Sequence, residues 1–117
     1  MDHITRKERT KASIEAAAID CFSHRGFNGV TMEEIAAKAE LTKRTVYNHY
    51  PTKGALIASI FERRLEELYQ LEQSALERCT TAREVIYTQF RVLSRFTKAN
   101  YGFMQMFWSL KDNINNG

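Results

Sequence analysis

The 23 residues TMEEIAAKAELTKRTVYNHYPTK, at positions 31–53, constrain the fold most, because they contain two helix starts and one helix stop. Thr31 and Glu34 have the Ser/Thr-x-x-Glu spacing of a capping box, which satisfies free amide donors at a helix start. Thr42 is a second N-cap candidate, and Pro51 ends the short helix that follows it. Two short helices joined by a turn of three or four residues have the geometry of a helix-turn-helix.

The second short helix separates apolar from polar side chains. Val46 and Tyr50 are four residues apart and are expected to face inward. The other side chains carry hydrogen-bonding groups suited to phosphates and base edges, namely Lys43, Arg44, Thr45, Tyr47, Asn48 and His49. The alternative for these polar residues is an ordinary solvated helix face. With the helix-turn-helix spacing around them, they predict a DNA-binding segment.

Helices are also predicted on both sides of this segment. Before it, a helix from about Arg6 to His24 carries one apolar stripe, made by Ile14, Ala17, Ala18, Cys21 and Phe22, and Gly26 suits a left-handed position at its end. After it, Thr52 can cap a long connector helix that reaches to about Arg78. Thr81 and Glu84 form another capping box, which opens a helix through Phe96. With no strand or hairpin signals, the predicted fold class is all-α.

The last apolar segment has more large side chains than one helix face can hold. They are Tyr101, Phe103, Met104, Met106, Phe107, Trp108 and Leu110. A helix of this kind is expected to be buried nearly all round. The segment suits a dimer interface, a contact with a further domain, or the wall of a ligand pocket. We favour the first two, because little chain remains to enclose a cavity.

Composition excludes several classes of protein and leaves others open. The net charge of +3 is modest for a nucleic-acid binder, so the placement of charges matters more than their total. No apolar run reaches the roughly 20 residues that cross a bilayer, and the N-terminus lacks a signal-peptide core, so a cytoplasmic protein without a membrane partner is expected. Cys21 and Cys79 match no metal spacing, and no cofactor is predicted. Without a nucleophile–base pair, paired carboxylates or a phosphate loop, we expect no enzyme.

Residues 14–56 resemble the TetR (tetracycline-repressor) family of bacterial transcriptional regulators. The positions that carry the resemblance are Ile14, Ala17, Ala18, Phe22, Gly26, Phe27, Val30, Thr31, Ile35, Ala36, Ala39, Thr42, Thr45, Val46, Tyr47, Tyr50, Lys53 and Leu56. The chain departs from the family at Glu40, where the turn usually has glycine, and at Gly54, where an acidic residue usually follows the lysine. The turn must therefore tolerate a side chain at Glu40.

The resemblance implies a three-helix helix-turn-helix head on a long connector helix, followed by part of a helical regulatory and dimerisation domain. The expected domains are 1–52 for DNA binding and 53–117 for the connector helix and a truncated ligand-binding or dimerisation domain. The chain is expected to be either a fragment or a natural short form. The expected partners are a double-stranded DNA operator, a second copy of the chain in a homodimer, and a small-molecule inducer whose site the short chain leaves incomplete.

The expected function is that of a repressor, which binds a palindromic operator as a dimer and is released by the inducer. Base-edge contacts are expected from Lys43, Arg44, Thr45 and Asn48, and phosphate contacts from Tyr47, His49, Lys53 and Thr31. Helix capping is an equal alternative for Thr31. A basic N-terminal arm, Arg6, Lys7, Arg9 and Lys11, either follows the DNA backbone or is a solvated terminus. The rival function is a helical protein-interaction module that keeps the head fold without binding DNA.

Overall fold

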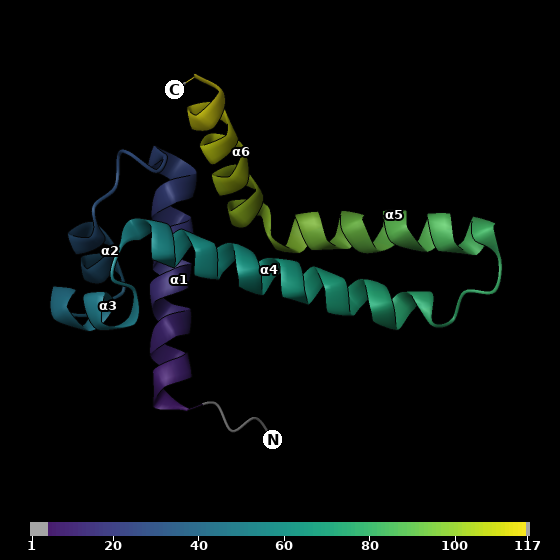
Figure 1. The fold of residues 1–117 in the computed structure, drawn as a ribbon, viewed down its shortest axis with the longest axis horizontal. Coiled ribbons are helices and arrows are strands. Elements are labelled where there is room, and N and C mark those ends of the chain that lie inside the picture. Colours follow the sequence, from purple (N-terminus) through teal and green to yellow (C-terminus); the bar gives the residue numbers. More distant parts are fainter. Residues whose placement is uncertain (1–4, 117) are drawn as a thin grey trace. The chain divides into compact units, whose positions relative to one another are not determined.

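The computed structural model describes residues 5–116, with the side chains of residues 5–111. This range forms α-helices and contains no strand (Figure 1). The helices are α1 (Arg6–Arg25), α2 (Met32–Lys38), α3 (Lys43–His49), α4 (Lys53–Leu76), α5 (Ala82–Ala99) and α6 (Tyr101–Asn116). The predicted all-α class is confirmed, and the first, connector and following helices end within three residues of the predicted positions.

The chain divides into two compact units. The first contains residues 1–57 and 102–117, and the second contains residues 58–101. The first unit therefore holds α1, α2, α3, the start of α4, and α6, whereas the second holds the rest of α4 together with α5. α6 is thus grouped with the head, and the functional division into 1–52 and 53–117 stays a prediction. Residues 1–4 and 117 of the expected domains lie outside the described range.

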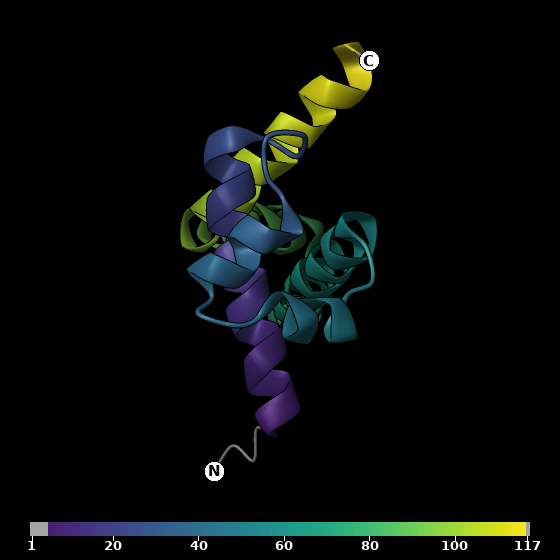
Figure 2. The same cartoon turned by 90° about the vertical axis from the view of Figure 1, so that its left-hand side faces the viewer.

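The head is built on α1, and α2 and α3 lie on one side of it (Figures 1 and 2). The apolar stripe predicted for the first helix is buried, as are the inner faces of α2 and α3. The buried side chains of the head include Ile14, Ala17, Ala18, Cys21, Phe22, Val30, Met32, Ile35, Ala36, Val46, Tyr50 and Leu56. Truncating a large side chain in such a core costs about 2–5 kcal/mol, so these contacts hold the short helices in place.

Four helix starts have the threonine caps that the sequence predicted. The Oγ1 atoms of Thr31, Thr42 and Thr81 accept a hydrogen bond from the backbone N–H three residues later, at 3.1, 3.2 and 3.2 Å. Thr52 does the same for Ala55 at 3.0 Å, at the start of α4. Each cap satisfies an amide that the helix leaves without a partner, which stabilises the fold by about 1 kcal/mol.

Two glycines shape the connection between α1 and α2. Gly26 ends α1 with φ of +77° and ψ of 169°. The positive φ favours glycine, as predicted, but the ψ value differs from that of a left-handed helical cap. At Gly29, an added Cβ atom would lie 2.6 Å from the backbone oxygen of Arg25. A side chain at position 29 would therefore clash with the backbone at the end of α1, which explains why this position is glycine.

α6 is only partly buried. Phe103 and Met106 are buried, while Tyr101, Phe107 and Trp108 are exposed. An added Cβ atom at Gly102 would lie 3.3 Å from Ile19 of α1, so the two helices approach closely at this glycine. α1 covers one face of α6, and the partner expected to bury the exposed side chains stays a prediction.

The turn between α2 and α3 contains a strained residue. Glu40 has φ of +58°, the only positive φ of a non-glycine residue in the described range. A Cβ atom in this region clashes with the neighbouring carbonyl and costs roughly 1–2 kcal/mol. The turn therefore accommodates Glu40, at a position where the family usually has glycine, at a cost in free energy.

We predict that Glu40→Gly raises the free energy of unfolding by about 1 kcal/mol, because glycine adopts this conformation without strain. Glu40→Ala is the matched control, since it removes the carboxylate and keeps the Cβ atom. Thermal or urea unfolding followed by circular dichroism would measure both. If alanine stabilised the protein as much as glycine, the gain would come from the lost charge and not from the backbone.

A buried hydrogen bond joins the end of α3 to α1. The hydroxyl of Tyr50 donates to the carboxylate of Glu15 at 2.6 Å, and both side chains are buried. Hydrogen bonds to charged groups are worth about 1.5–3 kcal/mol, and a buried carboxylate is costly when it loses a donor. This contact fixes the orientation of α3 relative to α1.

We predict that Tyr50→Phe lowers the free energy of unfolding by about 1.5–3 kcal/mol, because it removes a donor from the buried Glu15 carboxylate. Tyr47→Phe is the control, because Tyr47 is exposed on the same short helix and its hydroxyl is accessible to water. Urea unfolding at neutral pH would compare the two variants. Equal stability of Tyr50→Phe and the parent chain would contradict the assigned role of this hydrogen bond.

Candidate nucleic-acid interface

Six of the predicted DNA-binding residues lie on α3, and their side chains are separated from the core as expected. Val46 and Tyr50 are buried, which fixes the inner side of α3. The side chains of Lys43, Arg44, Tyr47 and Asn48 are exposed, and those of Thr45 and His49 are half-buried. The exposed side of α3 therefore presents two cations, a phenol and an amide to solvent.

The two half-buried residues have partners within the head. The Thr45 hydroxyl lies 2.8 Å from that of Thr42, the N-cap of the same helix. The His49 ring lies 6.4 Å from the Tyr50 ring, centroid to centroid. The side chains of Thr45 and His49 are therefore held more firmly than the four exposed ones. A contact of either with DNA would use a side chain that the fold already orients.

The positive charges near α3 differ in how far they are neutralised. Lys38 forms an ion pair with Asp20 of α1 at 2.6 Å, and the Lys43 ammonium lies 3.9 Å from a Glu33 carboxylate oxygen. Arg44 is exposed and has no ion-pair partner within residues 5–111. The cation in this region that is most available to an external anion is therefore Arg44.

Lys53 is directed into the head and not toward solvent. Its ammonium donates hydrogen bonds to the backbone oxygens of Phe27 and Val30, at 2.7 and 2.8 Å, and lies 4.3 Å from the centre of the Phe27 ring. These contacts join the first turn of α4 to the loop before α2. Two of the three N–H donors of the Lys53 ammonium are thus used within the protein. The sequence, in contrast, led us to expect an ammonium directed at a phosphate.

Thr31 acts as a cap, and its predicted partner has a further contact. Glu34 donates its backbone N–H to Thr31, and the Glu34 carboxylate forms an ion pair with Arg25. The Arg25 guanidinium also donates to the backbone oxygen of Gly29. Arg25 therefore ties the end of α1, the following turn and the start of α2 together, a role that the sequence analysis did not identify.

The basic residues of the N-terminal segment belong to a helix. Thr5 and Glu8 form a reciprocal capping box, which was not anticipated, and α1 begins at Arg6. Arg6, Lys7 and Arg9 are exposed on its first turns. They are presented by a capped helix and not by an extended arm.

Two carboxylates near the interface have lowered pKa values. The hydrogen bond from Lys38 lowers the pKa of Asp20, and the hydrogen bond from Arg25 lowers the pKa of Glu34. A carboxyl group whose pKa is lower in the folded protein stabilises the fold above its unfolded pKa. That contribution is lost as the pH falls through the folded pKa. Both ion pairs therefore favour the folded head at neutral pH and disappear in acid.

We predict that Lys38→Met raises the pKa of Asp20 toward its ordinary value and weakens the loss of stability below about pH 4. Lys43→Met is the control, because Lys43 lies beside Glu33 and not beside Asp20. Carboxyl titration by nuclear magnetic resonance would follow Asp20 in both variants. An unchanged Asp20 titration in Lys38→Met would show that the ion pair does not set this pKa.

Two further observations on the described part of the chain concern metal ligands and membrane spans. No group of three or more His, Cys, Asp or Glu residues there could hold a metal ion. None of its helices is both long and apolar enough to cross a membrane.

Comparison with known proteins links the head to bacterial regulators. Residues 14–60 match the family described as bacterial regulatory proteins, tetR family. The HTH-type transcriptional repressor SCO4008 of Streptomyces coelicolor is 39% identical over 61 residues, which are 52% of this chain and 32% of that protein. The HTH-type transcriptional regulator RutR of Escherichia coli K12 is 36% identical over 56 residues, which are 48% of this chain and 26% of that protein. The matched part of the chain thus covers a third or less of the length of these curated relatives.

A solved structure from Mesorhizobium loti, assigned to the same family, has a similar fold. It aligns with a TM-score of 0.68 at 24% sequence identity, over 96% of this chain and 56% of that one. At this identity the likeness concerns the fold alone. It nevertheless extends well beyond the head.

Proposed function

We propose that the chain is a regulator of the tetR family, whose description its residues 14–60 match, and that it regulates transcription by binding duplex DNA through α3. The observation that supports this most directly is the division of α3 into a buried side and a polar exposed side. Val46 and Tyr50 hold the helix on the head, so its exposed groups have a fixed direction. A helix presented in this way can enter the major groove of DNA.

Within this proposal, the side chains of α3 have different tasks. Arg44 can donate two hydrogen bonds to guanine, and Asn48 can pair with adenine. Lys43 and Thr45 contact bases or lie close to them. Tyr47 and His49 contact phosphates, which position the helix without reading sequence.

The residues at the starts of α2 and α4 have a supporting task. Lys53 donates to the backbone of Phe27 and Val30, so its first effect is to fix the loop that leads to Thr31. Its third donor and its charge can still favour a nearby phosphate. Thr31 caps α2 and exposes its side chain, so a phosphate contact there would add to the cap and not replace it.

We further propose that the operator is palindromic and that a dimer binds it as a repressor. Two heads related by a two-fold axis would reach half-sites about 34–36 Å apart, one turn of DNA, or a multiple of this distance. Release by a small-molecule inducer would then be a shift between two populations of head spacing. SCO4008, a relative of the head, is named a transcriptional repressor.

We predict that the chain binds duplex DNA with an affinity that falls steeply as salt rises, because binding releases counterions from phosphates. Arg44→Ala should weaken binding to the preferred sequence by about 10- to 100-fold, the effect of losing one good base contact. Lys43→Ala should make the affinity for DNA depend less steeply on salt concentration, because it removes one cation. Fluorescence anisotropy with a selected duplex at two salt concentrations would measure both.

The control is Arg91→Ala, which removes an exposed arginine from α5 and should leave DNA affinity unchanged. Equal losses in Arg44→Ala and Arg91→Ala would indicate a general charge effect without a reading helix. Absence of binding by the folded chain at low salt would favour the rival function, a helical module that interacts with proteins.

A further inference from the structure

A carboxylate lies beside the first residue of α3, among the cations of the candidate interface. Glu33 belongs to the first turn of α2, and one of its carboxylate oxygens lies 3.9 Å from the ammonium of Lys43. Both side chains are more than half exposed, Glu33 at 53% and Lys43 at 63%. The pair therefore lies on the outer surface of the helix-turn-helix, at the start of the helix that is proposed to enter the groove.

The neighbouring glutamate has a different task. Glu34 donates its backbone N–H to Thr31, and its carboxylate forms an ion pair with Arg25 at the end of α1. The Glu33 carboxylate is instead directed at Lys43 of the next helix. Of two adjacent acidic residues, one thus holds segments of the head together, and the other adjusts the charge of its outer surface.

The Glu33–Lys43 pair adds little to the stability of the head. Its atoms are farther apart than in a hydrogen bond, and exposed ion pairs are screened by water. An acidic residue in the first turn of a helix also interacts favourably with the helix dipole, but that effect does not need Lys43. The pair therefore matters most for anions that approach Lys43 from solvent.

The carboxylate acts on one kind of cation and leaves another free. Arg44 is exposed and has no ion-pair partner within residues 5–111, whereas Lys43 has Glu33 beside it. A guanidinium has a fixed fork of donors that suits a base edge, while an ammonium is a point charge that attracts any phosphate. Glu33 therefore weakens the less selective of the two attractions.

We propose that Glu33 is a positioning residue for DNA recognition, which restrains the Lys43 ammonium and weakens its attraction for phosphates. Binding to an arbitrary sequence depends on phosphates, whereas binding to the preferred sequence also uses the base contacts of Arg44 and Asn48. A loss of phosphate attraction thus weakens the arbitrary complex more, which raises specificity. The inference rests on the proposed function and adds to it a residue that controls how selectively DNA is bound.

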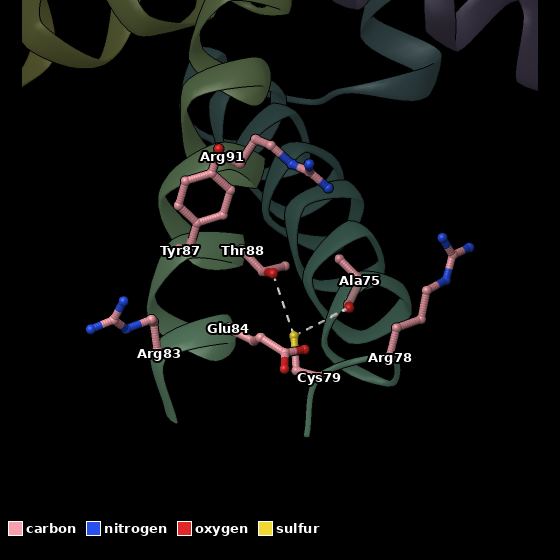
Figure 3. Close-up of a pocket in the computed structure, with 8 residues that line it drawn as sticks. All are labelled: Ala75, Arg78, Cys79, Arg83, Glu84, Tyr87, Thr88 and Arg91. Atoms are coloured by element: carbon pink, nitrogen blue, oxygen red, sulfur yellow. Dashed lines mark hydrogen bonds between the residues drawn. The ribbon is translucent and has the colours of Figure 1, made fainter. Parts of the chain in front are cut away.

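The second unit offers a matched carboxylate for control experiments. Glu84 is exposed in the first turn of α5, and it lines a cavity of about 360 Å³ together with Arg83 and Arg91 (Figure 3). Its carboxylate accepts a hydrogen bond from the hydroxyl of Thr81, the N-cap, at 3.2 Å. Like Glu33, it is an exposed acid in the first turn of a threonine-capped helix, but it belongs to α5 and not to the helix-turn-helix.

The first test is Glu33→Gln, which removes the charge and keeps the size of the side chain. Fluorescence anisotropy would compare a selected duplex with a scrambled duplex of equal length. Affinity for the scrambled duplex should rise about 3- to 10-fold and affinity for the selected duplex should rise less, so their ratio falls. The slope of log affinity against log salt should steepen by up to about 0.9, the value for one more neutralised phosphate.

Glu84→Gln should change neither the ratio of affinities nor the salt slope. Equal effects of Glu33→Gln and Glu84→Gln, or an unchanged ratio in Glu33→Gln, would overturn the inference and leave DNA binding by α3 in place. Absence of DNA binding by the parent chain at low salt would overturn the proposed function together with the inference. The two failures are therefore distinguishable.

The second test asks whether Glu33 acts through Lys43. Glu33→Gln is combined with Lys43→Ala, and the salt slopes of the parent, the two single variants and the double variant form a cycle. In the Lys43→Ala background, Glu33→Gln should no longer steepen the slope. Equal steepening in both backgrounds would show that the carboxylate repels DNA directly, which would overturn the proposed route through Lys43. Both side chains are exposed, and circular dichroism would establish that each variant keeps its helical signal.

Discussion

The structure of the head depends on the burial of one side of α3 against the rest of the helix-turn-helix unit. α3 has seven residues, too few to form a stable helix by itself in water. Val46 and Tyr50 fill the core beneath it, and the Tyr50 hydroxyl is bonded to the buried Glu15 carboxylate of α1. The helix exists because its inner side is held, and the same restraint gives its outer side a fixed direction.

Two further contacts hold the segments around α3 in place, and both lie outside α3 itself. Arg25 joins the end of α1 to Glu34 of α2, and Lys53 joins α4 to the loop before Thr31. Both use a cation to bind a carboxylate or backbone oxygens of another segment of the head. These contacts hold the head together, while Arg44 and Asn48 stay exposed on α3.

Much of the fold could be predicted because its signals are local. Thr31, Thr42, Thr52 and Thr81 act within three residues of themselves, and the apolar stripe of α1 repeats along a single helix. The inward direction of Lys53 could not be predicted, because its acceptors are backbone oxygens more than 20 residues away, which leave no mark in side-chain spacing. The packing of α6 on α1 could not be predicted for a similar reason, since the approach of Gly102 to Ile19 joins distant segments.

The central claim, that α3 is the surface that meets DNA, can be tested most directly by mapping amide chemical shifts while duplex DNA is added at low salt. The account predicts that the largest changes fall on residues 43–49 and at the starts of α2 and α4, while residues 82–99 of α5 change little. Changes centred on α5, or spread evenly over the chain, would contradict it.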